Sequence, residues 1–399
     1  MGGMSKLSRL PAARWLIPIL AAVVFIGGGS AVAAIATAGH RAPAPPEVSQ
    51  LLADVSQAHV RGLSGTIVQD SNLGIPELPG LGDGQSSDLQ SLVSGSHTLR
   101  VWYAGPKHVR LSLLGQFGES DVVRNGPDLW VWNSKARTAT HRTIPSSLPG
   151  ASRAGSMMRQ GPGVRDLTPQ GAARALLRVV GKSTKVTTGS NTTVANRPAW
   201  QLVLTPRTTS TLVGHVNIAI DTATKVPTRL QVFARGSSKP AFDVGYTSFD
   251  PTTPSMSVFG FNPPPGTKVT NKVGPLFGGV LHHPLQQMGQ HQMMQHQMMQ
   301  RMQSGATPPV QAPKLTGSGW GTVVVTQLPQ PGRSAGHAPN GTGLGQLGAI
   351  MQQLPKVSGS WGSGHLLQGT LFSVLVTDAG QVAVGAVPPE QLYAALGAS

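Results

Sequence analysis

Four histidines and six methionines lie close together between residues 282 and 302, and both residue types bind copper. They are His282, His283, Met288, His291, Met293, Met294, His296, Met298, Met299 and Met302. Soft thioethers suit Cu(I), and imidazole also suits Cu(II). Copper is therefore a candidate cofactor, and no other is expected. The tract is also rich in glutamine, a composition typical of a low-complexity linker. We favour this alternative, because a flexible segment does not hold metal ligands in a fixed geometry.

The rest of the chain offers few residues in patterns that support catalysis. The 15 acidic residues are spread out, and no pair at helical spacing indicates general acid–base chemistry. There is no Gly-x-Ser-x-Gly elbow, no phosphate-binding glycine loop and no His-Glu-x-x-His helix. A triad that forms only in the folded chain leaves no such motif. We expect a protein that is not an enzyme.

Composition limits the partners that the chain can have. The 399 residues carry a net charge of +16, and only 12% of them are charged. The basic residues are scattered, without a Lys/Arg block that alternates with aromatic residues, so we expect no nucleic-acid partner. A cationic chain can also lie against an anionic membrane or be a generally basic secreted protein. There is no cysteine, which excludes disulfides, zinc sites built on cysteine and an N-terminal lipid on cysteine.

The N-terminus has the charge pattern of an export segment. Lys6, Arg9 and Arg14 come before an apolar stretch, residues 15–38, and no acidic residue precedes Glu47. The stretch is long enough to cross a bilayer, while Ala-Thr-Ala at residues 36–38 fits a cleavage site. Either interpretation places residue 39 onward outside the cytoplasmic membrane. We favour an uncleaved anchor with an extracytoplasmic domain; cleavage would give a secreted or periplasmic protein.

Periodic patterns predict helices and many strands after a linker at residues 39–46. Helical spacing marks residues 46–60 and 169–180, and alternating residues mark two sets of strands between residues 63 and 249. This order indicates one antiparallel sheet with helices packed on one face. After the tract, residues 313–399 predict a second, smaller β domain. The expected divisions of the chain are an export segment (1–38), a linker (39–46), a first folded domain (47–275), the His/Met/Gln-rich linker (276–312) and a small C-terminal domain (313–399).

Apolar and aromatic residues in the first strands are candidates for a lipid-binding cavity. Those chosen are Leu99, Val101, Tyr103, Leu111, Leu113, Trp130 and Trp132. Trp130 and Trp132 share one face of a strand. For each residue taken singly, ordinary sheet packing is the simpler interpretation. Taken together, they lie on a curved sheet that, when covered by helices, easily leaves an apolar pocket.

Several motifs resemble the LolA/RseB (MucB) superfamily of outer-membrane lipoprotein carriers and sigma-factor regulators, in an actinobacterial form. Gly65-Thr66-Ile67-Val68 follows a helix, and the stretch from Asn125 to Trp132 is similar to the family's "dG..lWvy" strand. The stretch from Ile220 to Arg229 is similar to its "iD..tglPlr" hairpin, and that from Thr377 to Val387 is similar to the end of the smaller domain. The resemblance covers about half of the chain well.

The resemblance implies an α+β fold, mainly antiparallel β. A curved half-barrel sheet would carry helices on its concave face, and a small C-terminal β-rich domain would follow. It also implies a function without covalent chemistry, in which the concave face holds the acyl chains of a lipid or lipoprotein. The protein would act as a carrier or envelope sensor at the cytoplasmic membrane. The alternative is a regulator that binds a membrane protein such as an anti-sigma factor, and a further alternative is a copper binder.

Overall fold

The structure of the chain is a computed structural model that describes residues 44–58, 60–74, 95–116, 118–144, 181–273, 313–327 and 354–397. The expected export segment, the His/Met tract and the helix over residues 169–180 lie outside these ranges. Within the described residues, no helix has the length and apolar character needed to cross a membrane.

Six antiparallel strands form one half of a large sheet. They are β1 (Leu63–Ser71), β2 (Gly95–Tyr103), β3 (His108–Gly115), β4 (Gly118–Asn125), β5 (Asp128–Asn133) and β6 (Thr138–Thr143). Their alternating residues made most of them predictable, since the two faces of a sheet have different surroundings. A two-residue turn joins β4 to β5, and its Gly126 has a φ of 62°, which a residue without a Cβ adopts at little cost.

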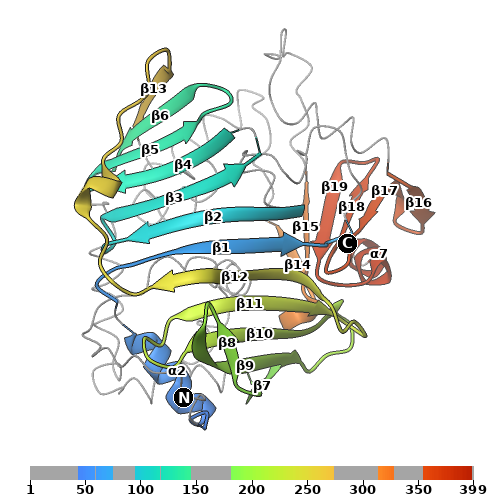
Figure 1. Cartoon of the computed structure of the whole chain (residues 1–399). Coiled ribbons are helices and arrows are strands. Elements are labelled where there is room, and N and C mark those ends of the chain that lie inside the picture. The colour runs from blue at the N-terminus through green and yellow to red at the C-terminus, as the bar shows by residue number, and fades with distance from the viewer. Residues whose placement is uncertain are drawn as a thin grey trace, which may run out of the picture.

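The second half of the sheet comes from the chain after residue 183. Its strands are β7 (Thr184–Thr188), β8 (Thr192–Val194), β9 (Arg197–Pro206), β10 (Val213–Asp221), β11 (Pro227–Ala234) and β12 (Pro240–Asp250). The chain then returns to the edge of the first half as β13 (Lys268–Val273). The 13-stranded sheet has the order β13-β6-β5-β4-β3-β2-β1-β12-β11-β10-β9-β7, with β8 paired to β9 (Figure 1). β13 pairs with β6 in parallel, while the other described pairs are antiparallel.

A second, 6-stranded sheet follows. Its order is β14-β15-β19-β18-β17-β16, and the bounds are β14 (Lys314–Thr316), β15 (Val323–Gln327), β16 (Lys356–Gly359), β17 (Gly362–Gln368), β18 (Ser373–Thr377) and β19 (Gln381–Gly385). The helix α7 (Pro389–Gly397) packs on this sheet. Leu392 of α7 and Leu375 of β18 are both fully buried in the core between them. This helix-on-sheet core is separate from that of the large sheet.

The helix α2 (Val48–Gln57) lies against the far half of the large sheet, beside β9 and β10. Its Leu51 is fully buried in a cluster with Trp200, Leu202 and Ile220. The helix carries apolar residues on one side, so burying that side removes them from water.

Several contacts join the two sheets. The indole of Trp320, in the turn η5 (Gly319–Gly321), donates a hydrogen bond of 2.7 Å to the hydroxyl of Thr184 on β7. Thr211 donates one of 2.6 Å to the carbonyl of Ala386. Leu371, from the loop between β17 and β18, belongs to the hydrophobic cluster of the large sheet. Polar and apolar contacts therefore both hold the second sheet against the first, and Figure 1 shows the two side by side.

The expected fold class is found in its main features. The structure is mostly antiparallel β, with a large curved sheet, few helices and a second small sheet (Figure 1). The expected covering of the concave face by helices remains a prediction, because one of the two helices meant to supply it lies outside the described residues.

Candidate apolar binding face

Strand register brings five of the seven candidate residues onto one face of the large sheet. Val101 of β2 is paired with Leu111 of β3, and Leu99 is paired with Leu113. Tyr103 lies on the same face, two residues beyond Val101. Because directly paired residues in an antiparallel sheet project to the same side, these side chains form one continuous surface. We name it the apolar face.

The apolar face continues across the central strand into the second half of the sheet. Ile67 of β1 is paired with both Leu99 and Tyr246 of β12. From β12 the register runs on through Val244, Leu230, Ile218 and Leu202, one residue on each of β12, β11, β10 and β9. A single apolar surface therefore runs from β3 to β9, and α2 packs on its β9 end.

Close approach at the middle of the apolar face depends on a glycine. A Cβ placed on Gly65 would lie 2.4 Å from the carbonyl oxygen of Ser248 and 2.8 Å from the ring of Tyr246. The Tyr246 ring occupies this space, and its side chain is buried, which raises the pKa of its phenol well above the usual value. The face is thus closely packed where β1 meets β12.

Two paired positions on the apolar face are polar although they are buried. Gln69 of β1 is paired with His97 of β2, and their exposed fractions are 6% and 3%. The Gln69 amide donates a hydrogen bond of 2.9 Å to the hydroxyl of Ser71. These groups lie at the end of β1, close to Leu73, where the carbonyl of Leu73 accepts a hydrogen bond from Thr370 of the second sheet. The face therefore ends in polar groups at the junction of the two sheets.

Trp130 and Trp132 do not lie on the apolar face, so the seven candidates do not line a single surface. The register pairs Leu111 with Val122 and Val122 with Val131, which places Val131 on the apolar face. The two tryptophans flank Val131 and therefore project to the opposite face. The sequence prediction that they share one face is confirmed, but it is the other face. Val122 and Val131 are among the residues that the prediction missed, as are the residues of the apolar face on β1 and on β9 to β12.

The opposite face carries an aromatic cluster at this end of the sheet. Trp130 stacks on His141 of β6 with ring centroids 4.3 Å apart, and Phe261 contacts Trp130 and Trp132 at 5.3 and 6.2 Å. The carboxylate of Asp128 lies 2.8 Å from the imidazole of His141, at hydrogen-bond distance. Phe261 follows the turn η4 (Met256–Phe259), which contacts β3 and β4 (Figure 1). These rings pack on one another, as side chains in a small satellite core do.

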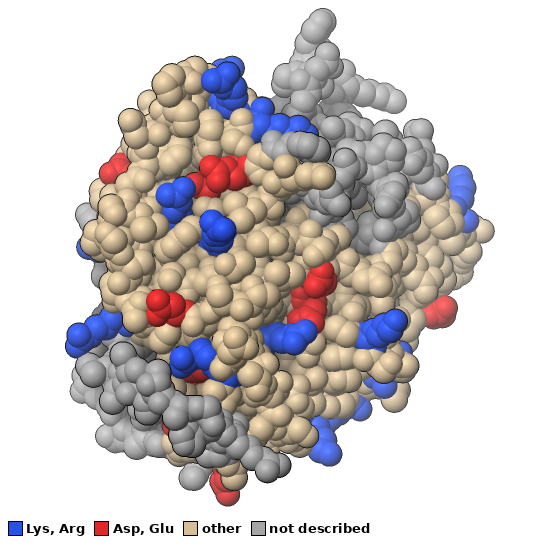
Figure 2. Space-filling view, in the orientation of Figure 1, with Lys and Arg blue, Asp and Glu red and all other residues tan. Residues whose placement is uncertain are grey.

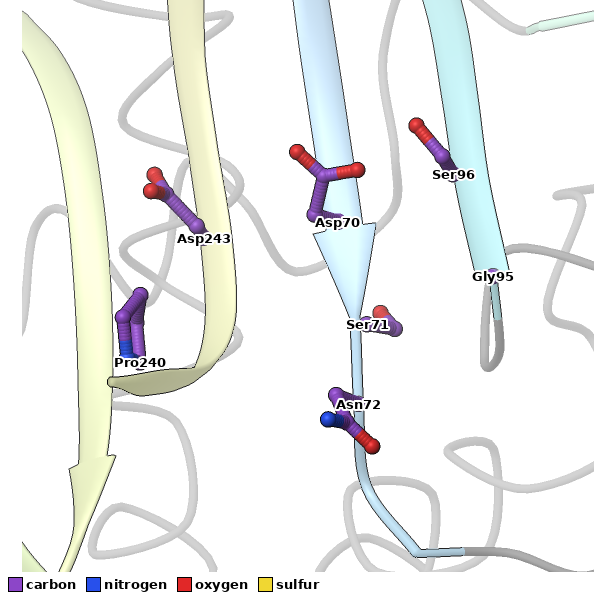
Figure 3. Close-up of a pocket in the computed structure, with 7 residues that line it drawn as sticks. All are labelled: Asp70, Ser71, Asn72, Gly95, Ser96, Pro240 and Asp243. Atoms are coloured by element: carbon purple, nitrogen blue, oxygen red, sulfur yellow. The ribbon is translucent and has the colours of Figure 1, made fainter. Parts of the chain in front are cut away.

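A shallow polar pocket lies elsewhere on the opposite face. It has a volume of about 380 Å³ and is lined by Asp70, Ser71, Asn72, Gly95, Ser96, Pro240 and Asp243. Figure 3 shows the carboxylates of Asp70 and Asp243 on the neighbouring strands β1 and β12. The Asp243 carboxylate already accepts hydrogen bonds from Arg229 and Gln231. In Figure 2, basic and acidic side chains are interspersed over the side in view.

The metal candidates are not placed by the structure. Every His and Met of the tract between residues 282 and 302 lies outside the described residues. Within the described ranges, no group of three or more His, Cys, Asp or Glu side chains could hold a metal ion. Copper binding by the tract stays a prediction.

The site is an open, mostly antiparallel sheet with one apolar face, joined to a smaller sheet that contributes to its core. No family model matches the chain, and no curated protein matches it. Solved structures do match. A MucB structure in complex with MucA(peri) has 14% identity and a TM-score of 0.41, covering 88% of this chain and 97% of that chain.

Two further structures are similar at low identity. The MucA/MucB complex of Pseudomonas aeruginosa has 14% identity and a TM-score of 0.40, covering 88% of this chain and 96% of that chain. A LolA superfamily protein from Nitrosomonas europaea has 10% identity and a TM-score of 0.20, covering 54% of this chain and 99% of that chain. The matched structures thus include both the LolA and the MucB kinds that the sequence motifs resemble.

Proposed function

We propose that the chain is an extracytoplasmic, non-enzymatic protein that binds the acyl chains of a lipid or lipoprotein on its apolar face. The observation that carries this proposal is the register of paired apolar residues from Leu111 through Ile67 to Leu202, which makes one continuous surface from β3 to β9. Such a surface suits a long flexible hydrocarbon better than a compact polar metabolite. Binding of this kind needs no reactive group.

The energetics of an acyl chain fit such a surface. Removing one CH₂ from water contributes about 0.8 kcal/mol, so ten of them supply roughly 8 kcal/mol before the costs of association. In this proposal a head group would lie beyond Gln69 and His97, the buried polar pair at which the face ends. A carrier and an envelope sensor would both use the face in this way.

Regulation of a membrane protein is the second candidate function. It is favoured by the packing of Leu371 and Trp320 from the second sheet into the hydrophobic cluster of the apolar face. A protein partner bound to the second sheet would therefore contact a part of the chain that packs directly against the residues of the apolar face. The exposed edge strand β16, which includes Lys356 with a side chain 63% exposed, is a place for such a partner to add a strand.

Native mass spectrometry of residues 39–399, purified from a lysate that contains bacterial membranes, tests the first proposal. We expect a co-purifying mass that lipid extraction identifies as an acyl lipid. A chain that stays free of lipid even after incubation with liposomes would overturn lipid binding. In that case, a photocrosslinker at Lys356 tests the regulator: an adduct with a membrane protein supports it, and its absence opposes it. A crosslinker at exposed Ser237 on the large sheet is the matched control.

A further inference from the structure

A strap of chain crosses the opposite face of β3–β6 and exposes apolar groups there. The strap comprises residues 256–267. Its η4 turn contacts β3 and β4, its Phe261 covers the two tryptophans of β5, and its Pro265 carbonyl accepts a hydrogen bond of 3.1 Å from Arg137 at the turn between β5 and β6. After the strap, β13 continues along β6. The strap therefore runs from one end of these strands to the other.

One exposed apolar side chain lies at the start of the strap, and another lies on the strand that follows it. Among the described residues, the most exposed large hydrophobic residues are Met256, Val269 and Leu315, with exposed fractions of 51%, 44% and 38%. Met256 begins η4. Val269 of β13 is paired with Ala139, which shares a face with Trp132. Val269 therefore lies on the strap side of the sheet near Trp132, while Met256 lies where the strap begins, over β3 and β4.

Basic residues lie where the strap ends, and no carboxylate accompanies them on the strap. Lys135, Arg137 and Lys268 are exposed at the turn between β5 and β6 and at the start of β13, where the backbone N–H of Lys268 donates to the carbonyl of Arg137. The sequence contains no acidic residue from Pro251 to Val273. Two carboxylates lie near these basic residues: Asp128 is at hydrogen-bond distance from His141, and the backbone of Glu119 is hydrogen-bonded to Ser134, next to Lys135. The surface therefore combines exposed apolar groups with positive charge.

We propose that the strap, together with the turn between β5 and β6 and the start of β13, docks on the surface of an anionic phospholipid bilayer. Aromatic and apolar groups partition into the interfacial region of a bilayer, and lysine and arginine are attracted to anionic head groups. Binding of a protein or a glycan does not require a segment without acidic residues that ends beside exposed lysine and arginine. The apolar face lies on the other side of the sheet, so docking by the strap does not involve it.

The absence of cysteine makes a direct test simple. The whole chain, carrying Met256→Cys labelled with the fluorophore NBD, is mixed with vesicles of phosphatidylcholine alone or with about one third phosphatidylglycerol. We expect a blue shift and a rise in emission with the anionic vesicles, together with quenching by nitroxide lipids. Leu315→Cys, at an exposed position on the second sheet, is the matched control and should keep the emission of a label in water. It carries the same N-terminus, so it controls for membrane binding elsewhere in the chain.

Charge dependence completes the test. Lys135→Gln and Lys268→Gln should each weaken insertion of the 256 label into anionic vesicles by about fivefold, and high salt should have the same effect. The proposal is overturned if the label at 256 stays in water, if labels at 256 and 315 respond equally, or if salt and the glutamine variants change nothing. None of these outcomes bears on lipid binding by the apolar face, which is measured separately.

Discussion

Arg110 of β3 donates a hydrogen bond from its guanidinium to the carboxylate of Asp121 on β4, and the Asp121 side chain is only 1% exposed. The pair lies on the opposite face, where Arg110 also contacts the ring of Trp102 and the carbonyl of Val258 in η4. A buried carboxylate needs such a partner, because removing an ion from water is costly. The pair therefore fixes both the two strands and the strap above them.

Arg110→Met should destabilise the fold by about 3 kcal/mol, because it leaves a charged Asp121 buried without its cation. The exposed pair between Arg229 and Asp243 is the matched control, and Arg229→Met should cost less than about 1 kcal/mol. Urea unfolding at neutral pH measures both changes. Adding Asp121→Asn to Arg110→Met should restore part of the loss. If Arg110→Met and Arg229→Met lower the free energy of unfolding equally, burial of Asp121 is not what makes the first pair important.

Gly65→Ala should cost about 2 kcal/mol, because its new Cβ would lie 2.4 Å from the carbonyl oxygen of Ser248 and press on Tyr246. Gly260→Ala is the control, since the nearest atom to a Cβ there is 3.4 Å away. Thermal and urea unfolding compare the two variants. If Gly65→Ala is as stable as Gly260→Ala, the packing at the centre of the apolar face is looser than the contacts indicate.

Leu111→Gln and Trp130→Gln separate the two faces of the sheet. Leu111 lies on the apolar face, and an unpaired amide there costs about 1–3 kcal/mol, so acyl-lipid affinity should fall by roughly tenfold. Trp130 lies on the opposite face, and its variant should bind lipid as the unchanged chain does. Titration with a fluorescent fatty acid measures the affinities, and circular dichroism checks the fold. Loss of binding only in Trp130→Gln would place the lipid on the opposite face and contradict the proposal.

Asp221 should make stability depend on acid pH. Burial by itself would raise its pKa, but hydrogen bonds from Arg197 and Thr224 outweigh this and hold the pKa below the ordinary value of 3.8. A carboxylate with a lowered pKa in the folded state adds stability that is complete above the unfolded-state pKa. That stability is lost as pH falls through the folded-state pKa.

The unfolding free energy in urea, measured from about pH 6 down to about pH 2.5, should therefore fall at the acid end. Asp221→Asn should lower the free energy near neutral pH and flatten the acid slope. Arg197→Gln, which removes the main donor, should flatten it in the same way. An unchanged acid slope in both variants would show that other carboxylates set it.

Most strands could be predicted from the sequence, because alternation of apolar and polar residues is a local property. The stretch from Thr98 to Ala104 predicted β2, and the Asn125-Gly126 signal marks the turn after β4. Strand β13 was missed, because its sequence Lys-Val-Thr-Asn-Lys-Val offers little apolar alternation and its partner β6 lies far away in the chain. Parallel pairing with a distant strand leaves no local pattern.

The candidate site was predicted only in part, for a reason that concerns register. Alternation shows that Trp130 and Trp132 share a face, but it does not show which residues of β3 share it with them. That depends on the two-residue turn, which pairs Arg124 with Leu129 and so Val122 with Val131. Shifting a register by one residue moves every side chain to the other face. Had this turn been followed strand by strand, the sequence would have pointed to Val131.

The central position of β1 has a consequence for how the protein is made. β1 pairs with β12, and the contact between Thr66 and Ser248 joins residues 182 positions apart. The hairpins from β2 to β6 need only neighbouring residues, so we expect them to form early, whereas the seam between β1 and β12 must wait for the later half of the chain. During synthesis the first strand thus has only one of its two neighbours. Until the seam closes, the nascent chain lacks a complete core.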